Sequence, residues 1–445
     1  MVKPEAGGMP PLVVDPIKLS PPLGATLALL GIDGAAVVMH GGQGCAAFAK
    51  SLLTNHFREP IPLYTTALRQ EHVIMGAEGS LHQALQAVIH KHGPRVVGLV
   101  TTALTETSGD DVTGMVDRFR SLHRDAPPII PVFAPDFSGS LTTGYVKALH
   151  AVLDHLERTW EGSGERANRN CRTVNLVFGP NATPADVEET KDLFVEFGYE
   201  PLALPDLSGS LDGHLGTGVS PTTAGGVSLA ALERLREAAL TFSFARSVDA
   251  VAKRIAALTH SQPIAVAPQN TLLTIDGLVE TLMTVSGRPV SPRRLLERDR
   301  LKDRMLDARA WFAGRRVVLA GEPDVVHFLE HGLTAMGARV VGSFSPVSAK
   351  SSGHHANWRV GDFDQLERYC RHLPTGDYPD LLIANSHGRP TAEKLGLAFW
   401  SLGFPVQDRI GAPNECSVGY RGAHWWIAQA ANIIMAAETH DPLRE

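Results

Sequence analysis

The feature that most constrains the fold is a repeated order of elements: a short apolar strand, a turn, an amphipathic helix closed by glycine, and another apolar strand. One copy starts at the apolar run 174–178, and its helix is expected to begin at Thr183-Pro184, a good N-cap followed by a good first helical residue. A second copy spans Arg316 to Val341, and a third begins at Leu381. This order is typical of βαβ units and predicts an α/β protein with parallel sheets flanked by helices.

The third copy and the N-terminal third give the most specific expectations. After the strand at Leu381, the sequence predicts a helix from near Thr391 to Leu402 and then a strand at Phe404-Pro405-Val406. Near the N-terminus it predicts a helix at 80–92 and a buried strand at 96–102.

The chain has 445 residues, which is more than one hydrophobic core usually supports. A polar stretch at 161–170 and a charged segment at 292–316 are the candidate boundaries, and the second is expected to be a connecting helix. These features predict three α/β domains, at residues 1–168, 169–312 and 313–445, the last ending in a helical tail.

Charge and cysteine content narrow the class of partner. A formal net charge of −6 gives no overall attraction to nucleic acid or to an anionic membrane. The 4 cysteines have no disulfide-framework spacing, which favours a reducing compartment. Residues 1–11 lack the apolar core of a signal peptide, and apolar runs such as 25–32 are too short to span a membrane. We therefore expect a cytoplasmic protein that binds neither nucleic acid nor membrane.

The expected loops include one repeated sequence and two segments without an assigned role. The segment Pro135-Asp136-Phe137-Ser138-Gly139-Ser140-Leu141 is repeated, with one substitution, at 205–211, each time just beyond an expected strand. We interpret the repeat as one loop sequence used after two equivalent strands. The loop at 213–226 is too long for a simple turn, and the sequence assigns a role neither to this loop nor to the segment 345–358.

Cys45 is the cysteine with the most suggestive surroundings. An apolar strand runs into His40-Gly41-Gly42-Gln43-Gly44-Cys45, and a helix is expected to begin at the thiol. Free N–H groups and the helix dipole favour a thiolate there, which predicts a lowered pKa and a metal ligand or nucleophile. Cys171, Cys370 and Cys416 are scattered, so an iron–sulfur cluster at Cys45 would need thiolates from another chain.

Two other interpretations of this segment remain open. Residues 42–47 match the dinucleotide-binding pattern G-x-G-x-x-A after a strand, which would suit a nucleotide-dependent α/β enzyme. That pattern also requires an acidic residue after the next strand, whereas Glu59 lies before it. Alternatively, Cys45 is a buried structural cysteine in a tight turn.

Five segments spread over nearly the whole chain carry a family resemblance. They are Leu19–Ala25, His40–Cys45, His56–Pro62, Leu204–Gly213 and Gly403–Arg409. In this order they resemble the nitrogenase component 1 superfamily, and within it the β-type subunits that assemble the nitrogenase cofactor. The resemblance implies three Rossmann-like domains of the nitrogenase component 1 type.

The resemblance also implies which residues hold metal. In the nitrogenase β-subunit the positions of Ser20, Cys45 and Ala103 would each carry a cysteine, giving half of the P-cluster ligands. Only Cys45 is a cysteine here. The resemblance therefore implies a smaller [4Fe–4S] cluster, with Cys45 as the metal ligand from this chain and three thiolates from a partner. Gly44 and Cys45 are the cofactor-binding candidates, and no residue is assigned a catalytic role.

The function implied is that of a scaffold subunit more than of a stand-alone enzyme. The chain would be the β-type half of an α2β2 heterotetramer with a NifE-like subunit. That partner would hold most of an iron–molybdenum cofactor precursor, while the NifH iron protein and NifB or a cofactor carrier bind transiently. The alternative is a catalytic or electron-transfer subunit of a nitrogenase-like reductase of the vanadium or protochlorophyllide type.

Overall fold

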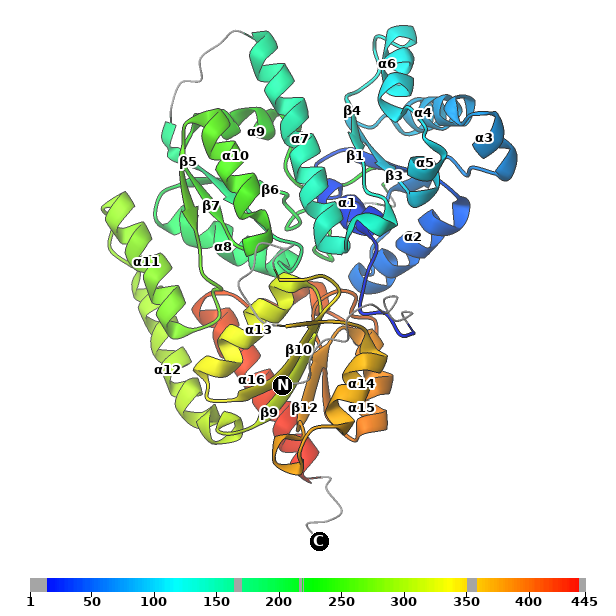
Figure 1. Cartoon of the computed structure of the whole chain (residues 1–445). Coiled ribbons are helices and arrows are strands. Elements are labelled where there is room, and N and C mark those ends of the chain that lie inside the picture. The colour runs from blue at the N-terminus through cyan, green and yellow to red at the C-terminus, as the bar shows by residue number, and fades with distance from the viewer. Residues whose placement is uncertain (1–13, 164–169, 216–217, 219, 350–357, 440–445) are drawn as a thin grey trace.

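The structure is a computed structural model that describes residues 14–163, 170–215, 218, 220–349 and 358–439. Within these residues the strands form three parallel sheets, each flanked by helices (Figure 1). The strand orders are β2-β1-β3-β4, β6-β5-β7-β8 and β11-β10-β9-β12-β13. The α/β class with parallel sheets, predicted from the repeated βαβ pattern, is confirmed.

The strands of the three sheets follow one another along the chain. The first sheet contains β1 (Ala35–His40), β2 (Leu63–Thr65), β3 (Val96–Thr101) and β4 (Ile129–Val132). The second contains β5 (Asn170–Val177), β6 (Glu200–Leu204), β7 (Ala238–Ser243) and β8 (Gln262–Ala265). The third contains β9 (Arg316–Ala320), β10 (Arg339–Ser345), β11 (Arg359–Val360), β12 (Leu381–Ala384) and β13 (Ala398–Ser401).

The helices alternate with the strands. Those before β5 are α1 (Pro21–Leu29), α2 (Gln43–Phe57), α3 (Gln70–Met75), α4 (Glu78–His92), α5 (Ala103–Ser108), α6 (Val112–Leu122) and α7 (Leu141–Ser163). Those between β5 and β9 are α8 (Pro184–Glu196), α9 (Leu229–Glu233), α10 (Asp249–Thr259), α11 (Leu272–Ser286) and α12 (Pro292–Phe312). The last are α13 (Pro323–Ala335), α14 (Phe363–Arg371), α15 (Arg389–Leu395) and α16 (Gly419–Thr439).

One predicted helix is wrong. The helix expected from Thr391 to Leu402 is split into α15 and the strand β13, which pairs in parallel with β12. Gly396 separates them, because it caps α15 with φ 64°, a left-handed conformation that favours glycine. The segment Phe404-Pro405-Val406, expected as a strand, is a loop.

Each sheet lies within one of the three predicted segments, and we propose 1–168, 169–312 and 313–445 as domains on that basis. The hydrophobic cores do not stop at these boundaries. One core joins Val37 of the first sheet to Leu204 of the second through α1 and α7, and α7 stands between the two sheets (Figure 1). The segments therefore pack as one body around shared helices.

Residues 14–20, the N-terminal strap, connect the third sheet to the first. The N–H of Val14 donates to Oδ2 of Asp362 at 2.9 Å, and the N–H of Phe363 donates to the carbonyl of Asp15 at 2.9 Å. Ile17 is buried in the core of the third sheet. The strap then enters α1, in which all 9 residues are buried.

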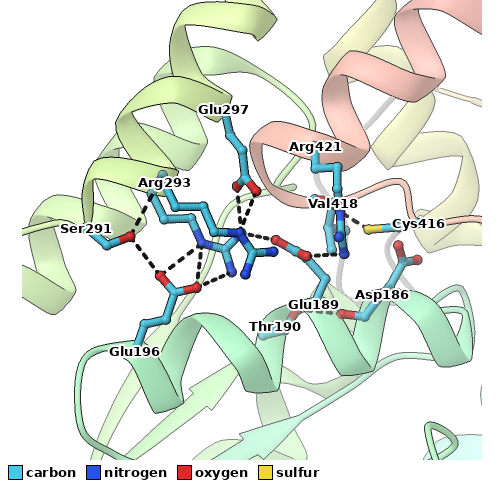
Figure 2. Close-up of polar contacts among 11 residues, drawn as sticks. Asp186, Glu189, Thr190, Glu196, Ser291, Arg293, Glu297, Cys416, Val418 and Arg421 are labelled. Carbon is cyan, nitrogen blue, oxygen red and sulfur yellow. Dashed lines mark hydrogen bonds and ion pairs between the residues drawn. The ribbon is translucent and has the colours of Figure 1, made fainter.

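A buried ion cluster ties the second sheet to the C-terminal helices. Arg294, only 2% exposed, lies on α12 and contacts Glu189 and Glu196 of α8 and Glu297 of its own helix. Arg421 of α16 reaches Glu189 at 2.6 Å, so one carboxylate joins three helices (Figure 2). Removal of one member would leave a buried charge unpaired, which typically costs about 3–5 kcal/mol.

Candidate metal centre at Cys45

Cys45 lies on the surface at the first turn of α2. β1 ends at His40, Gly42 is the N-cap, and Cys45 is the third residue of the helix. The helix thus begins two residues earlier than expected, at Gln43. In this first turn the backbone N–H groups have no partner within the helix, so they remain available to an anionic group. The side chain of Cys45 is exposed, which rules out a buried structural cysteine.

Hydrogen bonds from two neighbouring strands fix the turn before Cys45. The N–H of Gly41 donates to Oγ1 of Thr66 at 3.0 Å, and Oγ1 of Thr102 donates to the carbonyl of His40 at 3.0 Å. A Cβ atom at Gly41 would lie 2.3 Å from Oγ1 of Thr102, so only glycine fits there. The turn is therefore rigid where it leaves the sheet.

The space above the turn is open. A Cβ atom at Gly42 or Gly44 would meet nothing within 4 Å, although neither glycine has an unusual backbone conformation. An exposed thiol, a helix N-terminus and an open approach are the features that an anionic iron–sulfur cluster requires. The residues present at Gly44 and Cys45 therefore fit the cluster that the family resemblance implies.

Asp136 links the three helix starts on this side of the molecule. Its Oδ2 accepts a hydrogen bond from the N–H of Ala103 at 3.4 Å, and its carbonyl accepts one from Nζ of Lys18 at 2.9 Å. Ala103 begins α5, while Lys18 lies two residues before Ser20, the N-cap of α1. The positions of Ser20, Cys45 and Ala103 thus belong to one region of the first domain, and only Cys45 supplies a thiol.

The predicted lowering of the Cys45 pKa is wrong for the isolated chain. Partial burial and then the negative charge of Asp136 raise the pKa of the thiol, and together they outweigh the lowering by its backbone hydrogen bond. The prediction rested on the N-terminus of the helix alone and did not include Asp136, which lies in a loop that is distant in the sequence. An acidic residue shortly after β4 was the available signal. Binding of a metal would have to displace the thiol proton.

Exposed apolar side chains lie next to the residues of this region in the sequence. Phe48, one helical turn after Cys45, is 63% exposed, and Phe137, next to Asp136, is 70% exposed. Leu104, next to Ala103, is 38% exposed. We call these four residues, Cys45, Phe48, Leu104 and Phe137, the Cys45 face. Exposed aromatic and aliphatic side chains gathered beside a functional group are typical of a protein interface.

The other cysteines lie in different environments. Cys370 is buried in the core of the third sheet, where burial raises its pKa to about 11. Cys416 donates a hydrogen bond to the carbonyl of Val418 at 3.4 Å, and burial, followed by the charge of Asp186, raises its pKa strongly (Figure 2). Cys171 is exposed on β5, in the second sheet. All 4 cysteines are free thiols.

No set of three or more histidine, cysteine, aspartate or glutamate side chains is arranged to hold a metal ion in the part of the chain that the structure describes. Cys45 alone offers one of the four thiolates that a cluster normally takes. The remaining ligands of any cluster at this site would therefore have to come from another subunit.

The structure gives little support to a nucleotide at the same turn. The next strand, β2, ends at Thr65 and is followed by Thr66, whose hydroxyl oxygen already accepts the N–H of Gly41. Glu59 precedes β2, and the residue that follows this strand is Thr66 in place of the acidic residue that the dinucleotide-binding pattern has there.

Comparison with known proteins places the whole chain in one family. The model of the "Nitrogenase component 1 type Oxidoreductase" family matches residues 20–435. The protein named nitrogenase iron-molybdenum cofactor biosynthesis protein NifN from Rippkaea orientalis is 35% identical, covering 97% of this chain and 95% of that protein. The NifN proteins of Bradyrhizobium diazoefficiens and Klebsiella pneumoniae are 34% and 33% identical, covering 95% and 98% of this chain and 90% and 95% of their own lengths.

The chain belongs to the NifN family. A solved structure of a nitrogenase component, "Nitrogenase Cp1 at pH 6.5", supports the fold of this NifN family member. It superposes with a TM-score of 0.87 at 24% identity and covers 98% of this chain and 96% of its own. The predicted nitrogenase component 1 fold is therefore confirmed. Among the described residues, no helix combines the length and apolar character needed to cross a membrane.

Proposed function

We propose that this NifN family member is the β-type subunit of a two-subunit scaffold on which an iron–molybdenum cofactor precursor matures before transfer to apo-nitrogenase. The relatives are named as iron–molybdenum cofactor biosynthesis proteins, which supports the pathway. The partner is a NifE-like α-type subunit in an α2β2 assembly, and it holds most of the precursor. NifH and NifB or a cofactor carrier bind transiently, and the assembly works in the cytoplasm.

One observation carries this proposal. Three helix starts lie together beside Asp136, yet Cys45 alone among Ser20, Cys45 and Ala103 has a thiol. A single exposed thiolate suits a [4Fe–4S] cluster shared across an interface, with three ligands from the partner. It does not suit an eight-iron cluster that takes half of its ligands from each subunit.

The role of this chain follows from its own groups. Cys45 gives one thiolate, while the N–H groups at the start of α2, Gly44 among them, offset the negative charge of the cluster. Phe48, Leu104 and Phe137 lose their exposure when the partner covers the Cys45 face. The cluster, when bound, supplies electron transfer. Because its ligands come from two chains, iron binding and subunit association are thermodynamically linked.

The test is a Cys45→Ala variant co-expressed with the NifE-like subunit and purified as the complex. We expect the loss of about four irons per αβ pair and of the corresponding EPR signal, because the cluster loses one of its ligands. The fold of the subunit should be unchanged, since Cys45 is exposed. Cys370→Ala and Cys416→Ala are the matched controls and should retain the iron. Unchanged iron content in Cys45→Ala would refute the ligand assignment.

A further inference from the structure

A cavity of about 500 Å³ lies where the three sheets meet, away from the Cys45 face. Its walls include His56 of α2 from the first domain, Phe178 and Phe244 from the second, and Phe328 and Phe404 from the third. The volume lies within the usual range for small-molecule sites, about 300–1,000 Å³. Neither the cluster proposed above nor the ion cluster around Arg294 uses this cavity.

The topology of the second sheet places the cavity where α/β proteins bind ligands. In the order β6-β5-β7-β8, the chain moves outward from β5 to β6 and then crosses back to β7. The strand order therefore reverses between β5 and β7, and ligands usually occupy the crevice at that point, beyond the carboxyl ends of the strands. Residues 178–184 follow β5 and residues 244–246 follow β7, and both segments line the cavity.

The acidic side chains that line the cavity already have hydrogen-bond partners within the protein. Asp186 accepts the N–H of Ser417 at 2.6 Å, and Asp249 accepts the hydroxyl of Ser243 at 2.5 Å. The carboxylate of Glu415 pairs with Arg409, whose remaining donors bond to Ser401. Asp324 likewise accepts hydrogen bonds from the N–H and the hydroxyl of Ser247. These carboxylates are therefore occupied in holding the cavity wall together.

Among the described donors that line the cavity, His56 and Arg246 each keep N–H groups without an acceptor in the protein. His56 is 8% exposed, and its Nδ1 accepts the N–H of Val406 at 2.9 Å. Burial lowers its pKa to about 3, so the ring is neutral and carries its hydrogen on Nε2, for which the described residues supply no acceptor. Arg246 donates through Nε to Nε2 of His327 at 3.2 Å, which leaves the two amino groups of its guanidinium free.

Much of the rest of the wall is apolar and aromatic, alongside polar side chains such as Asn181 and Gln269. The rings of Phe178 and Phe244 are stacked with their centroids 5.1 Å apart, and Phe404 approaches the ring of His56 at 4.8 Å. No described cysteine lines the cavity, so no thiolate is available to bind a metal cluster there. The free N–H groups of His56 and Arg246 suit a ligand with acceptor oxygens, and the phenylalanine rings suit a ligand with a flat apolar body.

We propose that this cavity binds a small organic anion. Its carboxylate is held by the free amino groups of Arg246, its apolar or aromatic body lies among Phe178, Phe244 and Phe404, and a second oxygen accepts the Nε2–H of His56. The inference stands independently of the cluster at Cys45, because every residue it uses comes from this one chain and lies outside the Cys45 face.

The test measures binding of 2-naphthoate, and of its uncharged analogue 2-naphthamide, to the full chain by ligand-detected NMR. The naphthalene ring matches the aromatic wall, and only the carboxylate can form an ion pair with Arg246. We expect naphthoate to bind at least about tenfold more tightly than naphthamide, a difference of about 1.4 kcal/mol. Arg246→Gln should remove this preference, because glutamine has no positive charge to pair with the carboxylate. The fold should be unchanged, since Arg246 is exposed.

Arg300→Gln is the matched control, since Arg300 is an exposed arginine of α12 that does not line the cavity. This variant makes the same change in net charge and should keep the preference for naphthoate. Three results would overturn the proposal: no binding of naphthoate at millimolar concentration, equal binding of the two probes, or an equal effect of the two substitutions.

Discussion

The two copies of the Pro-Asp-x-Ser-Gly-Ser-Leu loop have the same local sequence and opposite surroundings. In the first copy, after β4, Phe137 is 70% exposed, whereas in the second, after β6, Leu207 is 3% exposed and belongs to the core shared by the first two sheets. The aspartates differ in the same way. Asp136 faces Cys45, while Asp206 is bound by Nζ of Lys191 at 2.7 Å and by the N–H of Ser208 at 3.0 Å.

This comparison separates what a loop sequence determines from what its neighbours determine. Both copies turn the chain after a strand and place a large apolar side chain next to an aspartate. The rest of the chain covers Leu207, and it leaves Phe137 uncovered. We infer that the first copy needs another molecule to do what α1 and the second sheet do for the second copy.

The largest expected effect is on stability, and it concerns the second copy of the loop, in which Leu207 is buried. Leu207→Ala should lower the free energy of unfolding by about 2–5 kcal/mol, because it removes a buried side chain and leaves a cavity. Denaturant unfolding followed by circular dichroism measures the change. Phe137→Ala in the open copy is the matched control, with an expected change within about 0.5 kcal/mol. Equal losses in both variants would show that the isolated chain also covers Phe137.

The next effect is on the association with the partner subunit, and it concerns the first copy of the loop, in which Phe137 is exposed. Phe137→Ala should weaken binding of the NifE-like subunit about tenfold or more, since aromatic side chains at the centre of an interface often contribute over 1 kcal/mol. Isothermal titration calorimetry of the two purified subunits gives the affinity. Val195→Ala, on an exposed apolar residue of α8, is the control and should leave the affinity unchanged. An unchanged affinity in Phe137→Ala would place the partner on another surface.

The smallest effect concerns the two aspartates. Asp136→Asn should lower the pKa of Cys45, because the variant lacks the negative charge that disfavours the thiolate. Alkylation of Cys45 by iodoacetamide at pH 8 should then become about two to three times faster, since the thiolate is the reactive form. Asp206→Asn is the matched control and should leave the alkylation rate unchanged. A slower reaction in Asp136→Asn would contradict the assigned influence of Asp136.

Much of the fold could be predicted from local sequence. The strand at 174–178, the N-cap Thr183 and the connecting helix at 292–316 correspond to β5, α8 and α12, because apolar periodicity and capping residues act over a few neighbours. The error after Thr391 has the same origin. The apolar run at 397–402 suits either a helix face or a buried strand, and only its pairing with β12 decides for the strand.

The candidate site was predictable in part. The turn and a helix start close to Cys45 follow from the segment around it, although the helix begins at Gln43, whereas the exposure of the thiol comes from the structure alone. The direction of its pKa shift depends on partial burial and on Asp136, which lies far along the chain, so the segment around Cys45 alone does not reveal it. The cavity was not predicted, because its walls come from many separate segments of the chain.

The N-terminal strap has a consequence for how the protein is made. Val14 is synthesised 348 residues before Asp362, whose carboxylate accepts its N–H, and Asp15 likewise precedes Phe363. Domains generally fold in the order of their synthesis. The strap is an exception to that order, because its contacts with the third sheet can form only once residues 362 and 363 have been made. The hydrogen bonds that fix the turn before Cys45 come from Thr66 and Thr102 of the first domain, so they do not have to wait for the third sheet.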